Sequence, residues 1–147
     1  MTIKKNYVII YIENKKERKG EYIMARYAIW AFENTYGGLH GYESRIVVED
    51  IPGRPYTIED LEKEASGYSR EIIEDFDTIY DEMEEWINSE DYYEEEYDEV
   101  YEEMVGENIG YCIYKIVKGE DKTVEELEDM FFNNREAFIK DYCEQVV

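Results

Sequence analysis

The sequence predicts an α+β fold. We expect a small, mainly antiparallel sheet of about four strands, packed on one face by three to four helices, in the order β-β-β-α-α-α-β-α. Aromatic and β-branched runs fill the first 50 residues, and amphipathic helical patterns follow from residue 57. One further apolar run, Tyr111–Lys118, comes late in the chain and is expected to join the same sheet. Strands grouped ahead of helices are typical of this fold class.

Length and composition indicate one folded domain over residues 1–147. A chain of 147 residues can bury roughly two-thirds of the surface that it exposes when unfolded. Its 16 tyrosines, five phenylalanines and two tryptophans argue against an acidic disordered chain, which would lack aromatic residues. The longest apolar runs, Tyr7–Ile12 and Tyr27–Phe32, are far shorter than the ~20 residues of a membrane-spanning helix. Pro and Gly are too sparse to form an interdomain linker.

Three strands are expected in the N-terminal third. Tyr7–Glu13 is rich in β-branched and aromatic residues, and the polar turn 14–20 separates it from Glu21–Phe32. These two runs would pair as a hairpin, although the Ala and Met residues of the second are also compatible with a helix. After a glycine-rich loop, Tyr42–Asp50 provides the third strand, which the turn-forming Ile51–Pro55 closes.

Helices are expected next. Thr57-Ile-Glu-Asp60 fits the capping pattern and predicts a short helix over 57–66. Gly67 is expected to end that helix, and Ser69 to cap a second one that runs to about residue 88. Their apolar residues share one arc while acidic residues fill the remainder, as in a helix that packs on a core.

A third acidic helix is expected from Ser89 to about residue 105. A second capping pattern, Thr123-Val-Glu-Glu126, then predicts the C-terminal helix. In the third helix the apolar stripe would consist of Tyr93, Tyr97, Val100, Tyr101 and Met104.

The acidic charge is concentrated in one part of the chain. The formal net charge is −22, from 38 acidic and 16 basic residues. Residues 59–107 hold 22 of the acids and only two basic residues, Lys63 and Arg70, so this segment alone carries −20. On a helix rising 1.5 Å per residue, that density is one charge per ~3.3 Å, close to the ~3.4 Å of a single DNA strand. Like charges at this spacing destabilise a helix, so their retention suggests that they are used.

This charge distribution predicts a nucleic-acid mimic: a non-enzymatic inhibitor that binds the basic DNA- or RNA-binding groove of a nuclease, restriction or CRISPR effector, or toxin. Phage and mobile-element proteins of the anti-restriction and anti-CRISPR type use this strategy. Tyr92 is expected to be exposed on the acidic side of the third helix, where it would stack in place of a base. The acidic segment is placed at about 57–105. The predicted partner-binding residues are Asp77, Asp81, Glu84, Glu85, Asp91, Tyr92, Glu94, Glu95, Glu96, Asp98, Glu99, Glu102 and Glu103.

Other functions remain as alternatives. An antitoxin or immunity-type acidic module would bind a partner without mimicry, and an acidic run can also be only a solvated surface. A small enzyme is a third possibility, with His40 as general base and Cys112 or Cys143 as nucleophile. Against this third reading, no family signature of a Cys/His, serine-hydrolase, phosphate-loop or dinucleotide-binding enzyme occurs.

The remaining patterns lead to narrower expectations. No calcium-loop or Glu-x-x-His pattern occurs, so we expect no metal or cofactor. No cleavable signal pattern follows the N-terminal apolar run, which favours a cytoplasmic protein. At this charge we expect no direct binding to nucleic acid or to an anionic membrane.

The polar turn between the first two strands is cationic. It would solubilise the first hairpin, or dock on the acidic face of a second copy. Its basic residues are Lys15, Lys16, Arg18 and Lys19.

Overall fold

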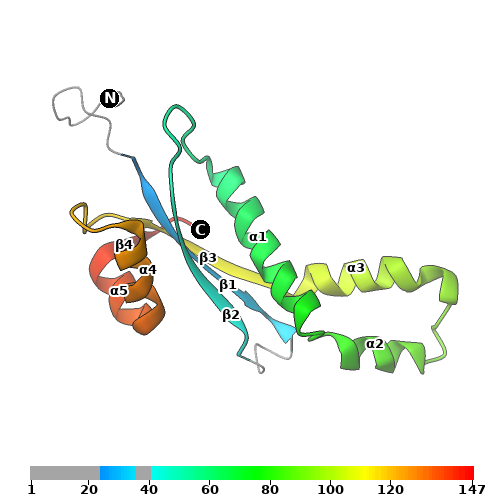
Figure 1. The fold of residues 1–147 in the computed structure, drawn as a ribbon. Helices are drawn as coiled ribbons and strands as arrows, with labels where there is room; N and C mark the ends of the chain where they lie inside the picture. The colour runs from blue at the N-terminus through cyan, green and yellow to red at the C-terminus, as the bar shows by residue number, and fades with distance from the viewer. Residues whose placement is uncertain (1–23, 36–40) are drawn as a thin grey trace.

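The protein has an α+β fold, as the sequence predicts. The computed structural model describes residues 24–35 and 41–147, which contain an antiparallel sheet in the order β2-β1-β3-β4 (Figure 1). The strands are β1 (Arg26–Glu33), β2 (Glu43–Glu49), β3 (Ile109–Ile116) and β4 (Cys143–Gln145). The strand expected at Tyr7–Glu13 and the cationic turn after it lie outside the described residues.

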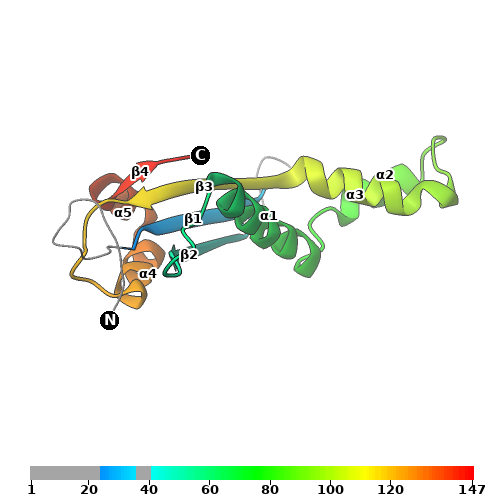
Figure 2. The same cartoon turned by 90° about the horizontal axis from the view of Figure 1, so that it is seen from above.

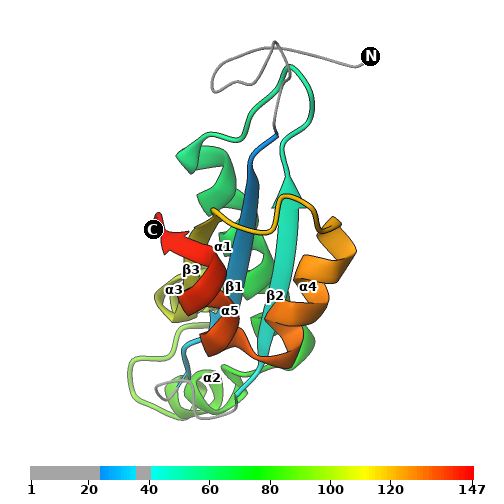
Figure 3. The ribbon, with the colours of Figure 1, turned by 90° about the vertical axis from the view of Figure 1, so that its left-hand side faces the viewer.

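Helices cover both faces of the sheet, so the expectation of helices on one face was wrong. On one face, α1 (Ile58–Asp75) packs against Ile29 and Ile113. On the other face, α4 (Val124–Asn133) and α5 (Arg135–Tyr142) pack against Ala28 and Tyr114 (Figure 3). The reason is visible in the strands: neighbouring residues point to opposite faces, and both Ala28 and Ile29 are fully buried. A sheet that is apolar on both faces needs a layer of helices on each.

The capping pattern at Thr57 is confirmed, but the helix after it is longer than expected. The Thr57 hydroxyl accepts a hydrogen bond from the Asp60 amide, and the Asp60 carboxylate accepts one from the Thr57 amide. The exposed Gly67 does not end the helix, because Leu61, Ala65 and Ile72 on the buried side of α1 keep the helix packed.

Ser69 is not a helix cap. It lies within α1 and is fully buried. Its hydroxyl donates to the carbonyl oxygen of Phe32 at 2.6 Å and accepts from the Gly110 amide at 3.0 Å. Ser69 therefore joins the end of β1 to the start of β3, at the point where α1 leaves the sheet.

Beyond α1 the chain forms a helical hairpin that projects past the end of the sheet (Figures 1 and 2). The helix breaks at Asp77, whose φ of 50° is the left-handed conformation that Asp tolerates better than most residues. The elements that follow are α2 (Tyr80–Ile87), the 3₁₀ turn η2 (Glu94–Glu96) and α3 (Tyr97–Asn108), which runs directly into β3. The predicted helices over 69–88 and from 89 thus have different boundaries. We call residues 76–108 the arm.

The arm has its own small core. Ile73 at the end of α1, Ile79 and Met83 of α2, and Val105 of α3 are buried together. Partly buried residues pack around them: Trp86, Val100, Tyr101, Met104 and Ile109. The arm is therefore attached to the sheet by continuous packing at its base.

The C-terminal region holds two helices where the sequence predicted one. The capping pattern at Thr123 is confirmed and begins α4. The helix is interrupted at Asn134, whose side chain accepts a hydrogen bond from the Ala137 amide and caps α5. The short strand β4, which pairs with the end of β3, was not predicted. Within the described part of the chain, no helix is both long and apolar enough to cross a membrane.

Candidate interaction surface

The arm carries the densest charge of the chain. Fifteen of the 33 residues from 76 to 108 are Asp or Glu, and none is Lys, Arg or His. All twelve predicted partner-binding acids lie here, and all are exposed. The structure thus brings together on one projecting hairpin residues that the sequence placed on two separate helices. They are Asp77, Asp81, Glu84, Glu85, Asp91, Glu94, Glu95, Glu96, Asp98, Glu99, Glu102 and Glu103.

The amphipathic pattern explains this distribution. Met83 of α2 and Val105 of α3 are directed into the small core of the arm. The acids lie between these apolar positions, and carboxylates that cannot be paired or neutralised remain at the solvent surface.

One cation lies at the base of this surface. Arg70 of α1 forms ion pairs with Glu74 at 3.0 Å and with Glu102 of α3 at 2.6 Å. Arg70 donates a hydrogen bond to the Glu102 carboxylate, and this bond together with the nearby carboxylates raises the pKa of Arg70. The same hydrogen bond lowers the pKa of Glu102. Of the twelve predicted acids, Glu102 alone is ion-paired within the described residues. It therefore contributes to positioning α3 against α1.

Tyr92 does not lie where the sequence placed it. It belongs to the segment between α2 and η2, it is only partly exposed, and its ring meets Trp86 edge-on with 5.0 Å between centroids. Tyr92 therefore covers the end of the arm's apolar core and is not a free stacking residue.

Other aromatic residues of the arm are exposed instead. Tyr93 is 63% exposed, Tyr80 55% and Phe76 54%, and Tyr97 is less so. The helical period of the sequence predicts that these residues belong to the apolar stripes of continuous helices. The break at Asp77 and the late start of α3 at Tyr97 remove them from those stripes. A left-handed Asp has no strong sequence signal, so this exposure could not be read from the helical period.

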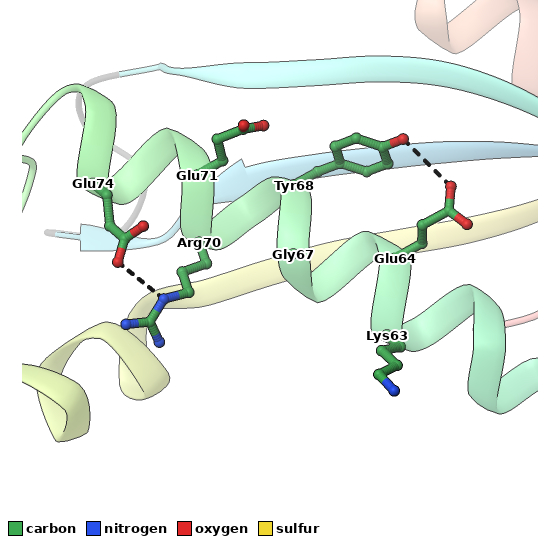
Figure 4. A pocket seen from close by; sticks show the side chains of 7 residues that line it. All are labelled: Lys63, Glu64, Gly67, Tyr68, Arg70, Glu71 and Glu74. Atoms are coloured by element: carbon green, nitrogen blue, oxygen red, sulfur yellow. Dashed lines mark hydrogen bonds and ion pairs between the residues drawn. The ribbon is translucent and has the colours of Figure 1, made fainter.

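A second surface feature, an open hollow of about 470 Å³, lies along α1 (Figure 4). Its polar lining residues are largely paired with one another: the Tyr68 hydroxyl donates to Glu64, and Arg70 pairs with Glu74. Lys63, Gly67 and Glu71 complete the lining. The hollow contains neither Cys nor His, and the structure offers no nucleophile paired with a base there.

The two cysteines are partly buried and pack against the core beside α4 and α5. Burial raises the pKa of the Cys143 thiol to about 12, which favours the unreactive thiol over the thiolate. Cys112 is partly buried in β3. His40 lies outside the described residues, so the arrangement of His40 with either cysteine remains a prediction. Among the described residues, no group of three or more His, Cys, Asp or Glu side chains is arranged to hold a metal ion.

No protein family matches the chain. No curated protein and no solved structure resembles it significantly.

Proposed function

We propose that this protein is a non-enzymatic, acidic mimic of nucleic acid that inhibits a basic DNA- or RNA-binding protein. The arm would enter the groove that normally holds the nucleic acid. The observation that supports this most is the arm itself: a projecting hairpin with 15 acids in 33 residues, no basic residue, and a small apolar core of its own.

The charge spacing on α3 fits this role. The helix carries five acids in its 12 residues, Tyr97–Asn108. At 1.5 Å per residue the helix is ~18 Å long, so it carries one acid per ~3.6 Å, compared with one phosphate per ~3.4 Å along one strand of B-DNA. A groove lined with Lys and Arg would attract such a surface over a long range, and the attraction would weaken with salt.

The shape of the arm also fits binding inside a groove of another protein. It extends away from the sheet, and the segment between α2 and α3 lies farthest from α4 and α5 (Figure 2). A partner can therefore contact both helices of the arm without meeting the body of the protein. A charge that served only solubility would be spread over the whole surface.

Competition for nucleic acid tests the proposal. A fluorescent DNA or RNA is bound to each of a panel of basic nucleases and nucleic-acid-binding proteins, and this protein is titrated in at 50, 150 and 300 mM salt. We expect at least one complex to release its nucleic acid, with a half-displacement concentration that rises steeply with salt.

Two variants of equal net charge make the test specific. The arm variant replaces four exposed acids by amides: Glu94, Glu95, Glu99 and Glu103. The control variant does the same on α4 and α5: Glu125, Asp129, Glu136 and Asp141, which are equally exposed. Displacement should fail only with the arm variant. If the arm variant binds a target as tightly as the unmodified protein, the arm is not the binding surface.

An antitoxin or immunity-type module without mimicry gives a different result in this assay. Such a module binds its partner beside the groove, so the fluorescent nucleic acid stays bound while this protein joins the complex. Release of the nucleic acid at saturation therefore separates mimicry from simple acidic recognition.

A further inference from the structure

The exposed face of the arm mixes aromatic rings with carboxylates. Phe76, Tyr80, Tyr93 and Tyr97 are all exposed, and each is adjacent in sequence to an Asp or Glu or one residue away from one. None of the four belongs to the buried cluster within the arm. We call these four exposed rings the aromatic surface of the arm.

Packing within the protein covers these rings only in part. Phe76 stacks on Tyr42 at 4.0 Å between centroids and 9° between planes, yet more than half of its surface remains exposed. Tyr97 makes a tilted contact with Trp86 at 6.4 Å. The rings of Tyr80 and Tyr93 have no ring–ring contact within the described residues. Exposed rings cost solvation free energy that burial against a partner would recover.

Duplex and single-stranded nucleic acids differ in whether they expose the faces of their bases. A duplex presents its phosphates outward and keeps the faces of its bases stacked inside, whereas a single strand presents phosphates and unstacked bases together. Proteins that bind single strands accordingly combine a cationic groove with aromatic platforms on which bases stack. A duplex mimic needs only the charges, and exposed rings add nothing to it.

We propose that the target of the arm is a groove that binds single-stranded nucleic acid, with Tyr80 and Tyr93 in the positions of unstacked bases. This inference rests on the proposed function and specifies its partner class. The carboxylates around the rings supply the charge complementarity with the Lys and Arg of such a groove, and the rings supply the stacking. Tyr93 is the stronger candidate because it is the most exposed aromatic residue of the arm.

The test compares two probes. One is an OB-fold protein holding fluorescent oligothymidylate, and the other is a basic duplex-binding protein holding a fluorescent duplex of equal length. The variants are Tyr80→Ala, Tyr93→Ala and Tyr93→Phe. Phe132→Ala is the matched control, because Phe132 is 71% exposed but lies on α4, away from the arm. Circular dichroism checks that each variant is folded.

We expect the single-stranded probe to be released at concentrations that leave the duplex bound. Each Tyr→Ala change should raise the half-displacement concentration roughly 5- to 150-fold, the usual range for loss of one base-stacking contact. The salt dependence should stay the same, because no charge is removed, whereas neutralising the arm's acids should flatten it. Tyr93→Phe and Phe132→Ala should behave like the unmodified protein.

Two results overturn the inference in distinguishable ways. If the duplex is released equally well, or if the Tyr→Ala variants compete normally, the mimic is not of a single strand, while the proposed function stands. If neither probe is released by the unmodified protein at low salt, this inference fails, and failure of the full panel above would remove the proposed function as well.

Discussion

Neighbouring acids on α3 should respond differently to neutralisation, because one of them is ion-paired and the other is not. Glu103 has an acid four residues away on either side, Glu99 and Glu107, and no cation within ion-pair distance among the described residues. Like charges at this spacing destabilise a helix by roughly 0.2–0.5 kcal/mol per pair. Glu103→Gln removes two such pairs and should stabilise the protein by about 0.4–1 kcal/mol. For a chain of this size that is a rise in Tm of about 1–4 °C.

The adjacent residue provides the control. Glu102 also has two such neighbours, Asp98 and Glu99, but it accepts a hydrogen bond from Arg70 at 2.6 Å. Glu102→Gln weakens this link between α3 and α1, so it should stabilise the protein less than Glu103→Gln does. The pKa of Glu102 is lowered from its ordinary value of 4.5. Its contribution is therefore fully present above that value and is lost as the pH falls through the lower, folded-state pKa. The difference between Glu102→Gln and the unmodified protein should vanish in acid.

Urea or thermal unfolding followed by circular dichroism measures both effects, at pH 7 and at pH 3. A lower stability of Glu103→Gln at pH 7 would contradict this prediction. Such a loss would mean that the arm's carboxylates contribute to folding, and the argument that their repulsion is kept for binding would then have no basis.

Three further predictions concern the body of the fold. Gly67→Ala should stabilise the protein by about 0.5–1 kcal/mol, because Gly67 lies inside α1 with open space where a Cβ would be. Gly110→Ala should destabilise it by roughly 1–3 kcal/mol, since the new methyl group would overlap the ring of Phe32; equal Tm values for the two variants would contradict both. Cys143 should react with iodoacetamide at pH 8 far more slowly in the folded protein than in 6 M guanidinium, because burial raises its pKa to about 12. Comparable rates by mass spectrometry would contradict its burial.

The fold class and both capping patterns could be predicted because they depend on local sequence. Thr57 and Thr123 each have a carboxylate three residues on, and each begins a helix as expected. The strands β1, β2 and β3 overlap the runs Glu21–Phe32, Tyr42–Asp50 and Tyr111–Lys118, whose aromatic and β-branched residues predict strands. The second layer of helices could not be predicted. A strand that is buried on both faces has a continuous apolar sequence, without the alternation of apolar and polar residues that would indicate which face is covered.

The helix boundaries failed where tertiary contacts override local signals. Gly67 is tolerated inside α1 because the opposite side of the helix packs on the sheet, and Ser69 is buried because it bridges two strand ends. The acidic surface itself was predictable, since exposure follows from charge. The aromatic surface was not, because Tyr80 and Tyr93 have the spacing of core residues and are exposed only by the turn at Asp77 and the shifted start of α3.

The most direct test of the arm as a nucleic-acid mimic is the ratio of half-displacement concentrations for the two variants that each lose four acids. Both carry the same net charge, so any effect of total charge cancels. If the arm occupies the groove, the variant altered at Glu94, Glu95, Glu99 and Glu103 should need at least ten times more protein than the one altered on α4 and α5. A ratio near one would contradict the account, because charge anywhere on the surface would then serve equally well.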